Sequence, residues 1–162
     1  MRQIMILGVT AAAAAVTGAC SDDHGDDDDG TSYNCLEETR ADEFVLGLTK
    51  PGEQGVYEFK LLSADPAPPA RGDNLWQLEV STIAAPVAPV SDATLRVTPF
   101  MPDHSHGSGK TVLVTPMTAG QYQLEPVNLW MPGLWEVTIQ AEAAQTGGTQ
   151  RDRVVFRFCL PS

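Results

Sequence analysis

Apolar and polar residues alternate along most of the chain after residue 44. This period of two is typical of β-strands that bury one face and expose the other. In the segment LWQLEVST, for example, Trp76, Leu78 and Val80 point to one side, whereas Gln77 and Glu79 point to the other. The same phase recurs in four further segments. The positions that we expect to form the core are Tyr57, Phe59, Leu61, Trp76, Leu78, Val80, Leu95, Val97, Trp135, Val137, Ile139, Phe156 and Phe158.

Turn-forming residues separate these segments. A proline-rich connection is expected over residues 63–74, a Pro-Gly turn begins the strand near Trp135, and TGGT at 146–149 is typical of a β-hairpin. No segment after residue 34 shows a helical stripe. Seven or eight short strands at this spacing predict an all-β fold, a single immunoglobulin-like β-sandwich.

The first 34 residues have a different character. Residues 1–19 combine Arg2 with a short apolar run, as in a signal peptide, and VTGAC resembles the lipobox of bacterial lipoproteins. This resemblance implies that Cys20 carries lipid after cleavage, and Ser21 then favours an outer-membrane location facing the periplasm. The alternative is a secreted protein cut at an A-x-A site. Residues 20–34 are predicted to be an acidic, disordered tether, and residues 35–162 the folded domain.

The other two cysteines, Cys35 and Cys159, lie near the two ends of that domain. An exported chain enters an oxidising compartment, where such a pair usually forms a disulfide; two free thiols are the alternative. The alternation places Cys159 on the same side as Arg157. A disulfide would therefore attach the N-terminal segment to the outer face or the edge of the last strand.

Composition and motifs exclude two classes of function. The net charge of −11 is the opposite of what a nucleic-acid-binding protein needs. An enzyme would need a nucleophile with a positioned base or an open metal site. Ser105 lies between two histidines but has no evident orienting acid, so we expect no enzymatic activity.

The segment MPDHSHGSGK at 101–110 carries the candidate chemistry. Met101, His104 and His106 lie within six residues, and Met131 precedes a proline in the same way as Met101. Thioether and imidazole donors suit copper better than zinc. If the two loops meet at one end of the sandwich, these four residues form a metal site.

Other interpretations of the same residues remain open. In one, the histidine-bearing loop is only polar and exposed. In another, Met131 fills a gap in the core, and in a third a histidine pairs with Asp103 or Asp92 without metal. We expect Trp130 and Trp135 to pack in the fold rather than to bind a ligand.

Residues from about 72 to 142 resemble the YtkA-like family of bacterial envelope domains, which is related to FixH-like domains. The matching segments are GDNLWQLEV, TLRVTPFMPDHSHGS and GQYQLEPVNLWMPGLWEVTIQA. The resemblance implies an immunoglobulin-like sandwich and an association with copper or heavy-metal handling, cation pumps and oxidase assembly. Two hypotheses follow: an anchored accessory protein that binds copper, or an envelope module that binds a protein partner without metal through its MPDHSHG loop.

Overall fold

The computed structural model describes residues 33–145 and 147–162, which lie within one compact unit, Thr31–Ser162. The predicted signal peptide and the lipidation site Cys20 lie outside the described residues, and so does most of the predicted tether. No helix in the described part of the chain is long and apolar enough to cross a membrane. The strands found there are β1 (Leu48–Pro51), β2 (Tyr57–Asp65), β3 (Gly72–Thr82), β4 (Thr94–Met101), β5 (His106–Gly107), β6 (Leu113–Pro116), β7 (Gln121–Leu129), β8 (Gly133–Gln145) and β9 (Gly148–Leu160).

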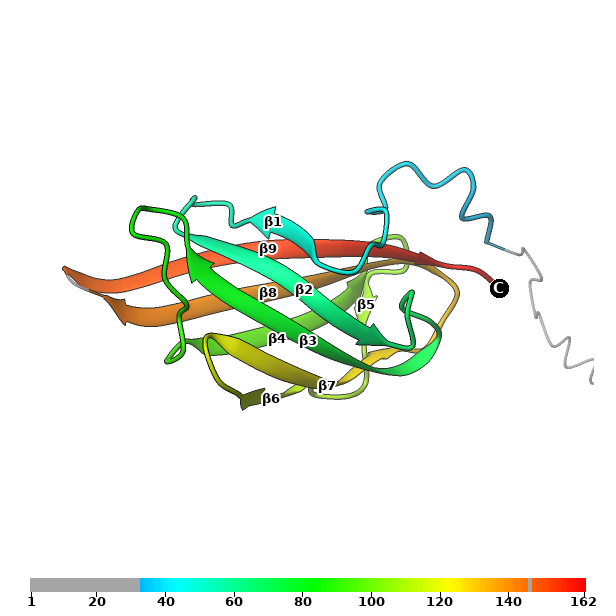
Figure 1. Cartoon of the computed structure of the whole chain (residues 1–162). Helices are drawn as coiled ribbons and strands as arrows, with labels where there is room; N and C mark the ends of the chain where they lie inside the picture. The colour runs from blue at the N-terminus through cyan, green and yellow to red at the C-terminus, as the bar shows by residue number, and fades with distance from the viewer. Residues whose placement is uncertain (1–32, 146) are drawn as a thin grey trace, which may run out of the picture. The chain divides into compact units, whose positions relative to one another are not determined.

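The strands form two antiparallel sheets packed face to face (Figure 1). One sheet has the order β1-β2-β3-β7-β6, and the other has the order β5-β4-β8-β9. If β2 to β9 are lettered A, B, C, C′, D, E, F and G, the sheets read A-B-E-D and C′-C-F-G. This is the strand order of immunoglobulin domains, with β1 added beside strand A. The predicted immunoglobulin-like sandwich is confirmed.

The core lies between the sheets and consists mainly of the residues expected from the alternation. Trp76, Leu78, Trp135 and most of the other expected positions are fully or almost fully buried. Leu95 and Val97 point inward but remain partly exposed. The reason is that β5 pairs only with the last two residues of β4, so the rest of β4 is an edge of its sheet.

The two predicted connections also have a definite structure. The proline-rich connection is shorter than expected, because β2 continues to Asp65 and β3 already begins at Gly72. The hairpin between β8 and β9 lies where the sequence predicts it, with Gln145 paired to Gly148. Gly147 and Gly148 have φ values of 103° and 127°, which glycine adopts without strain.

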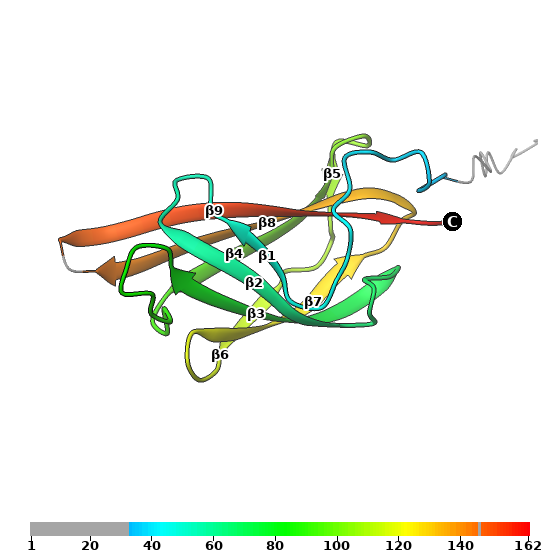
Figure 2. The ribbon, with the colours of Figure 1, turned by 45° about the horizontal axis from the view of Figure 1, so that its top comes forward.

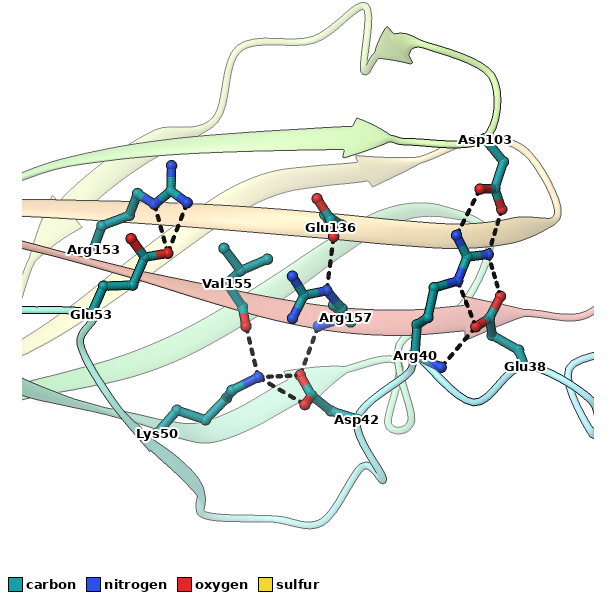
Figure 3. Close-up of polar contacts among 10 residues, drawn as sticks. All are labelled: Glu38, Arg40, Asp42, Lys50, Glu53, Asp103, Glu136, Arg153, Val155 and Arg157. Atoms are coloured by element: carbon teal, nitrogen blue, oxygen red, sulfur yellow. Dashed lines mark hydrogen bonds and ion pairs between the residues drawn. The ribbon is translucent and has the colours of Figure 1, made fainter.

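The outer edge of β9 is covered by the chain before β2 (Figure 3). The Asp42 backbone N–H donates to the Arg157 carbonyl at 2.8 Å, and the Asp42 carboxylate accepts from the Arg157 N–H at 2.8 Å. Lys50 Nζ donates to the Val155 carbonyl at 2.7 Å. Edge strands expose unpaired backbone groups that invite aggregation, and these contacts use several of them.

Asp152 on β9 holds the start of β2 in place. Its carboxylate is almost fully buried and accepts hydrogen bonds from the backbone N–H groups of Gln54, Val56, Tyr57 and Arg153 at 2.8–2.9 Å. Burial alone would raise the pKa of Asp152, but these four donors outweigh it and the pKa is lowered. The charged form therefore stabilises the junction between the two sheets.

Residues 33–42, which we call the strap, cross one end of the sandwich. The disulfide Cys35–Cys159 joins the strap to β9, with a Cα–Cα distance of 5.6 Å, as the alternation predicts. The strap contains no strand, and Tyr33, which the sequence analysis assigns to the tether, packs on the domain. Figures 1 and 2 show the strap at the same end as β5, with the tip of the β8–β9 hairpin at the opposite end.

Candidate metal site at the β4–β5 hairpin

The β4–β5 hairpin brings the first pair of candidate ligands together. Met101 ends β4 and is the register partner of His106, which begins β5. The turn between them includes Ser105 with φ of 54°, a left-handed conformation that is uncommon for residues other than glycine. Side chains directly opposite in an antiparallel pair lie on the same side of the sheet. Because Met101 points into the core, His106 lies on the inner side at the rim of the sandwich.

His106 is held between two tryptophans. Its ring stacks on Trp130, with centroids 5.2 Å apart and planes 22° apart, and meets Trp135 edge-on at 6.3 Å. The His106 Nδ1 atom lies 3.3 Å from the Gly107 carbonyl, which can only accept a hydrogen bond. In the neutral tautomer that donates this hydrogen bond, Nδ1 carries the proton and Nε2 has the free lone pair. Metal-bound histidines usually show this arrangement, because the second nitrogen fixes the tautomer.

The distance between the two imidazoles suits one shared ion. The ring centroids of His104 and His106 are 5.7 Å apart, and the planes are tilted by 36°. A metal–nitrogen bond of about 2 Å, with about 1 Å more to each ring centre, places two ligating rings about 5–6 Å apart. His104 is exposed and His106 is partly buried, so the pair spans from the rim of the core to the solvent.

The methionines of the described residues divide between the two ends of the sandwich. Met101 is fully buried, and its methyl group lies 2.9 Å from the position that a Cβ atom on Gly133 would occupy. Met131 is partly buried against the core, and its carbonyl accepts the Trp135 indole N–H at 3.0 Å. Met117 lies before the start of β7 and is exposed. The structure thus places Met101 and Met131 at the end that carries the histidines, and Met117 at the other end of β7.

The carboxylate in this loop does not pair with a histidine. Asp103 accepts two hydrogen bonds from Arg40 in the strap, from Nη1 to Oδ1 and from Nη2 to Oδ2, both at 2.7 Å (Figure 3). Arg40 lowers the pKa of Asp103. The proposed pairing of Asp103 with a histidine is therefore wrong: a long-range ion pair with a guanidinium, which binds carboxylates through two parallel bonds, uses both oxygens.

Glu38 and Tyr33 complete this contact between strap and loop. The Arg40 guanidinium donates to Glu38 at 2.6 Å, and so does the Tyr33 hydroxyl. Hydrogen bonds from Arg40, and then from Tyr33, lower the pKa of Glu38 to about 2. Burial, together with the bond to Glu38, raises the pKa of Tyr33 to about 12. The Tyr33 ring lies over Gly133, beside the methyl group of Met101.

Sequence reasoning missed three residues of this region. Arg40 and Tyr33 contact the loop from more than sixty positions away, and no local pattern indicates that contact. Trp130 was expected to pack within the fold, as Trp135 does, but it is 47% exposed and stacks on His106. The sequence does contain a signal at this point: the alternation of polar and apolar residues stops at the end of β7, where Leu129, Trp130 and Met131 are all apolar.

The donor set is composed of nitrogen and sulfur. Among the described residues, no three His, Cys, Asp or Glu side chains come together in a way that holds a metal ion. Thioethers are outside that group of residue types. Any metal at this hairpin would thus rely on His104 and His106, with sulfur from Met101 or Met131.

The fold and this hairpin define an immunoglobulin-like sandwich with a histidine- and methionine-bearing loop at one end. A family model described as YtkA-like matches residues 49–140, more than half of the 162-residue chain, and the chain belongs to that family. The match begins within β1 rather than near residue 72, so the first two strands are part of the family domain. Neither the curated proteins nor the solved structures contain a match.

Proposed function

We propose that this protein is an accessory copper-binding lipoprotein of the cell envelope, anchored through Cys20 and without enzymatic activity. His104 and His106 are the primary ligands, and Met101 and Met131 are the sulfur donors. The role is to hold or pass copper beside a membrane transporter or oxidase. Membership of the YtkA-like family supports an envelope-associated domain.

The observation that carries the copper assignment is the pair of imidazole rings 5.7 Å apart on the β4–β5 hairpin. Met101 is the register partner of His106, so a soft donor belongs to the same short hairpin. Cu(I) accepts imidazole and thioether ligands at low coordination numbers, whereas structural zinc favours four ligands rich in thiolate and imidazole. The residues present therefore fit copper better than zinc.

The disulfide supports the export that this proposal requires. Disulfides persist in oxidising compartments such as the periplasm and are rare in the cytosol. Cys35 and Cys159 are joined in the structure, which fits a domain outside the cytoplasm. Lipidation itself is tested by metabolic labelling with a fatty-acid probe: we expect label on the wild-type chain and none on Cys20→Ser.

The copper site is tested on residues 31–162, which span the compact unit with its own core and disulfide. The domain is titrated with Cu(I) against a competing chelator, with Zn(II) as the comparison ion. We expect one equivalent of Cu(I) bound more tightly than about 1 μM, a binding free energy of about −8 kcal/mol. The double variant His104→Ala/His106→Ala should lose this binding and keep the melting temperature of the wild type. Equal Cu(I) affinity in both proteins would disprove the site.

A second function is favoured by the exposed aromatic residues near the hairpin. Trp130 and Phe100 are both partly exposed, and Trp130 with the two histidines forms a surface suited to a protein contact. In that case a partner captured from cross-linked envelope extracts would survive treatment with chelator and be lost when residues 102–105 are replaced. A partner that leaves with the metal would count against this alternative.

A further inference from the structure

Asp103 is a potential hard ligand beside the two histidines in the sequence. It directly precedes His104 and lies in the same hairpin turn. Two imidazoles and one carboxylate are a common ligand set for zinc, with water in the fourth position. A free Asp103 carboxylate would therefore complete a site for Zn(II) at this hairpin.

In the structure, the Asp103 carboxylate forms an ion pair with Arg40. Both of its oxygens accept hydrogen bonds from the Arg40 guanidinium at 2.7 Å, and the Tyr33 hydroxyl lies 3.3 Å away. Figure 3 shows the Asp103 carboxylate directed at the Arg40 guanidinium, which also contacts Glu38. In agreement, Asp103 forms no three-ligand group with His104 and His106 in the described part of the chain.

Arg40 is well suited to keep the carboxylate away from a metal. A guanidinium is permanently charged, and its planar fork matches both carboxylate oxygens at once. Glu38 accepts a hydrogen bond from the same guanidinium, and its side chain is only 5% exposed. This buried carboxylate helps to fix the orientation of the Arg40 guanidinium. The disulfide at Cys35 anchors the strap close to these residues.

We infer that Arg40 determines metal specificity: by holding Asp103, it leaves a soft imidazole and thioether set that binds Cu(I) and rejects Zn(II). Arg40 contacts no candidate ligand itself and acts as a positioning residue through Asp103. This inference rests on the copper site proposed above and adds the residue that selects the metal.

The test compares Zn(II) and Cu(I) affinities of four variants of residues 31–162. Arg40→Ala should bind Zn(II) about tenfold or more tightly than the wild type, because one oxygen ligand is released, and keep its Cu(I) affinity. Arg40→Ala/Asp103→Asn should return to the weak wild-type Zn(II) affinity. Asp103→Asn alone should change neither ion. Arg153→Ala is the matched control, because Arg153 forms a similar exposed ion pair with Glu53 away from the hairpin.

The outcomes separate the inference from the copper site. If Arg40→Ala gains no Zn(II) affinity, or if the gain persists in Arg40→Ala/Asp103→Asn, the role of Arg40 is disproved whatever the Cu(I) result. If the wild type fails to bind Cu(I) but Arg40→Ala gains Zn(II) through Asp103, the copper function is wrong and the masking of Asp103 stands. Arg40 is half-exposed, and a melting curve for each variant confirms that the fold is retained.

Discussion

Met101 has two possible roles, a core residue and a copper ligand, and one conservative substitution distinguishes them. It is a core residue, fully buried beside Gly133, and it is also a candidate copper ligand opposite His106. Replacing Met101 by Ala would confuse the two, because removing a buried methionine side chain costs about 2–5 kcal/mol of folding stability. Met101→Leu keeps almost the same volume and costs less than about 1.5 kcal/mol, while it removes the only sulfur at this position.

The expected effect on copper binding is similar in free energy to the largest expected effect on folding, and the two are measured separately. If the Met101 sulfur binds Cu(I) together with the imidazoles, Met101→Leu should weaken Cu(I) binding about tenfold or more, equivalent to about 1.4 kcal/mol. A leucine cannot replace the soft donor. Zn(II) affinity should not change, because zinc gains little from a thioether.

The assay is the chelator competition used for the wild type, with a guanidinium unfolding curve on the same sample. Met117→Leu is the control, since Met117 is exposed at the other end of β7. Wild-type Cu(I) affinity in Met101→Leu would refute the reasoning. Met101 would then be a core residue only, and the remaining candidate ligands would be His104, His106 and Met131.

Three further predictions concern the structure around the site. Asp152→Asn should lower the free energy of unfolding by about 3 kcal/mol in a denaturant titration at pH 7, because an amide cannot accept four backbone N–H bonds. Since folding lowers the pKa of Asp152, the difference from wild type should shrink as the pH falls below about 3.9 and should not change at higher pH. Cys35→Ser/Cys159→Ser should cost up to about 4–5 kcal/mol in the same titration, because the disulfide spans 124 positions. Trp130→Ala should weaken Cu(I) binding about two- to tenfold in the chelator competition through loss of the stack on His106, and unchanged affinity would remove Trp130 from the site.

The sequence predicts the long strands of both sheets well, because burial of one face leaves a clear period of two. Trp76, Leu78 and Trp135 illustrate this, and the same phase reaches Cys159 and places the disulfide at the edge of β9. The short strands β1, β5 and β6 have two to four residues, too few to show a period. Their positions depend on pairing with neighbours, which local patterns do not record.

The candidate site was predictable to the same extent as the strand that precedes it. The inward phase of Leu95 and Val97, continued along β4, reaches Met101, so its burial follows from the sequence. The pairing of Met101 with His106 needs the length of the turn as well, which a loop rich in polar residues does not reveal. The contact between Arg40 and Asp103 joins positions 63 apart and depends on the strap crossing this end of the sandwich.

The strap connects the stability of the fold to the chemistry of the hairpin. Asp42 pairs with the edge of β9, Cys35 is covalently bound to it, and Arg40 between them holds Asp103. A segment fixed at two points restricts the backbone of the residues between them, so Arg40 needs little additional ordering to keep its fork on the carboxylate. The hairpin turn includes Ser105 in a left-handed conformation, which costs free energy and persists only where surrounding contacts hold it. We therefore expect the disulfide to help keep Arg40 on Asp103, as well as to stabilise the sandwich.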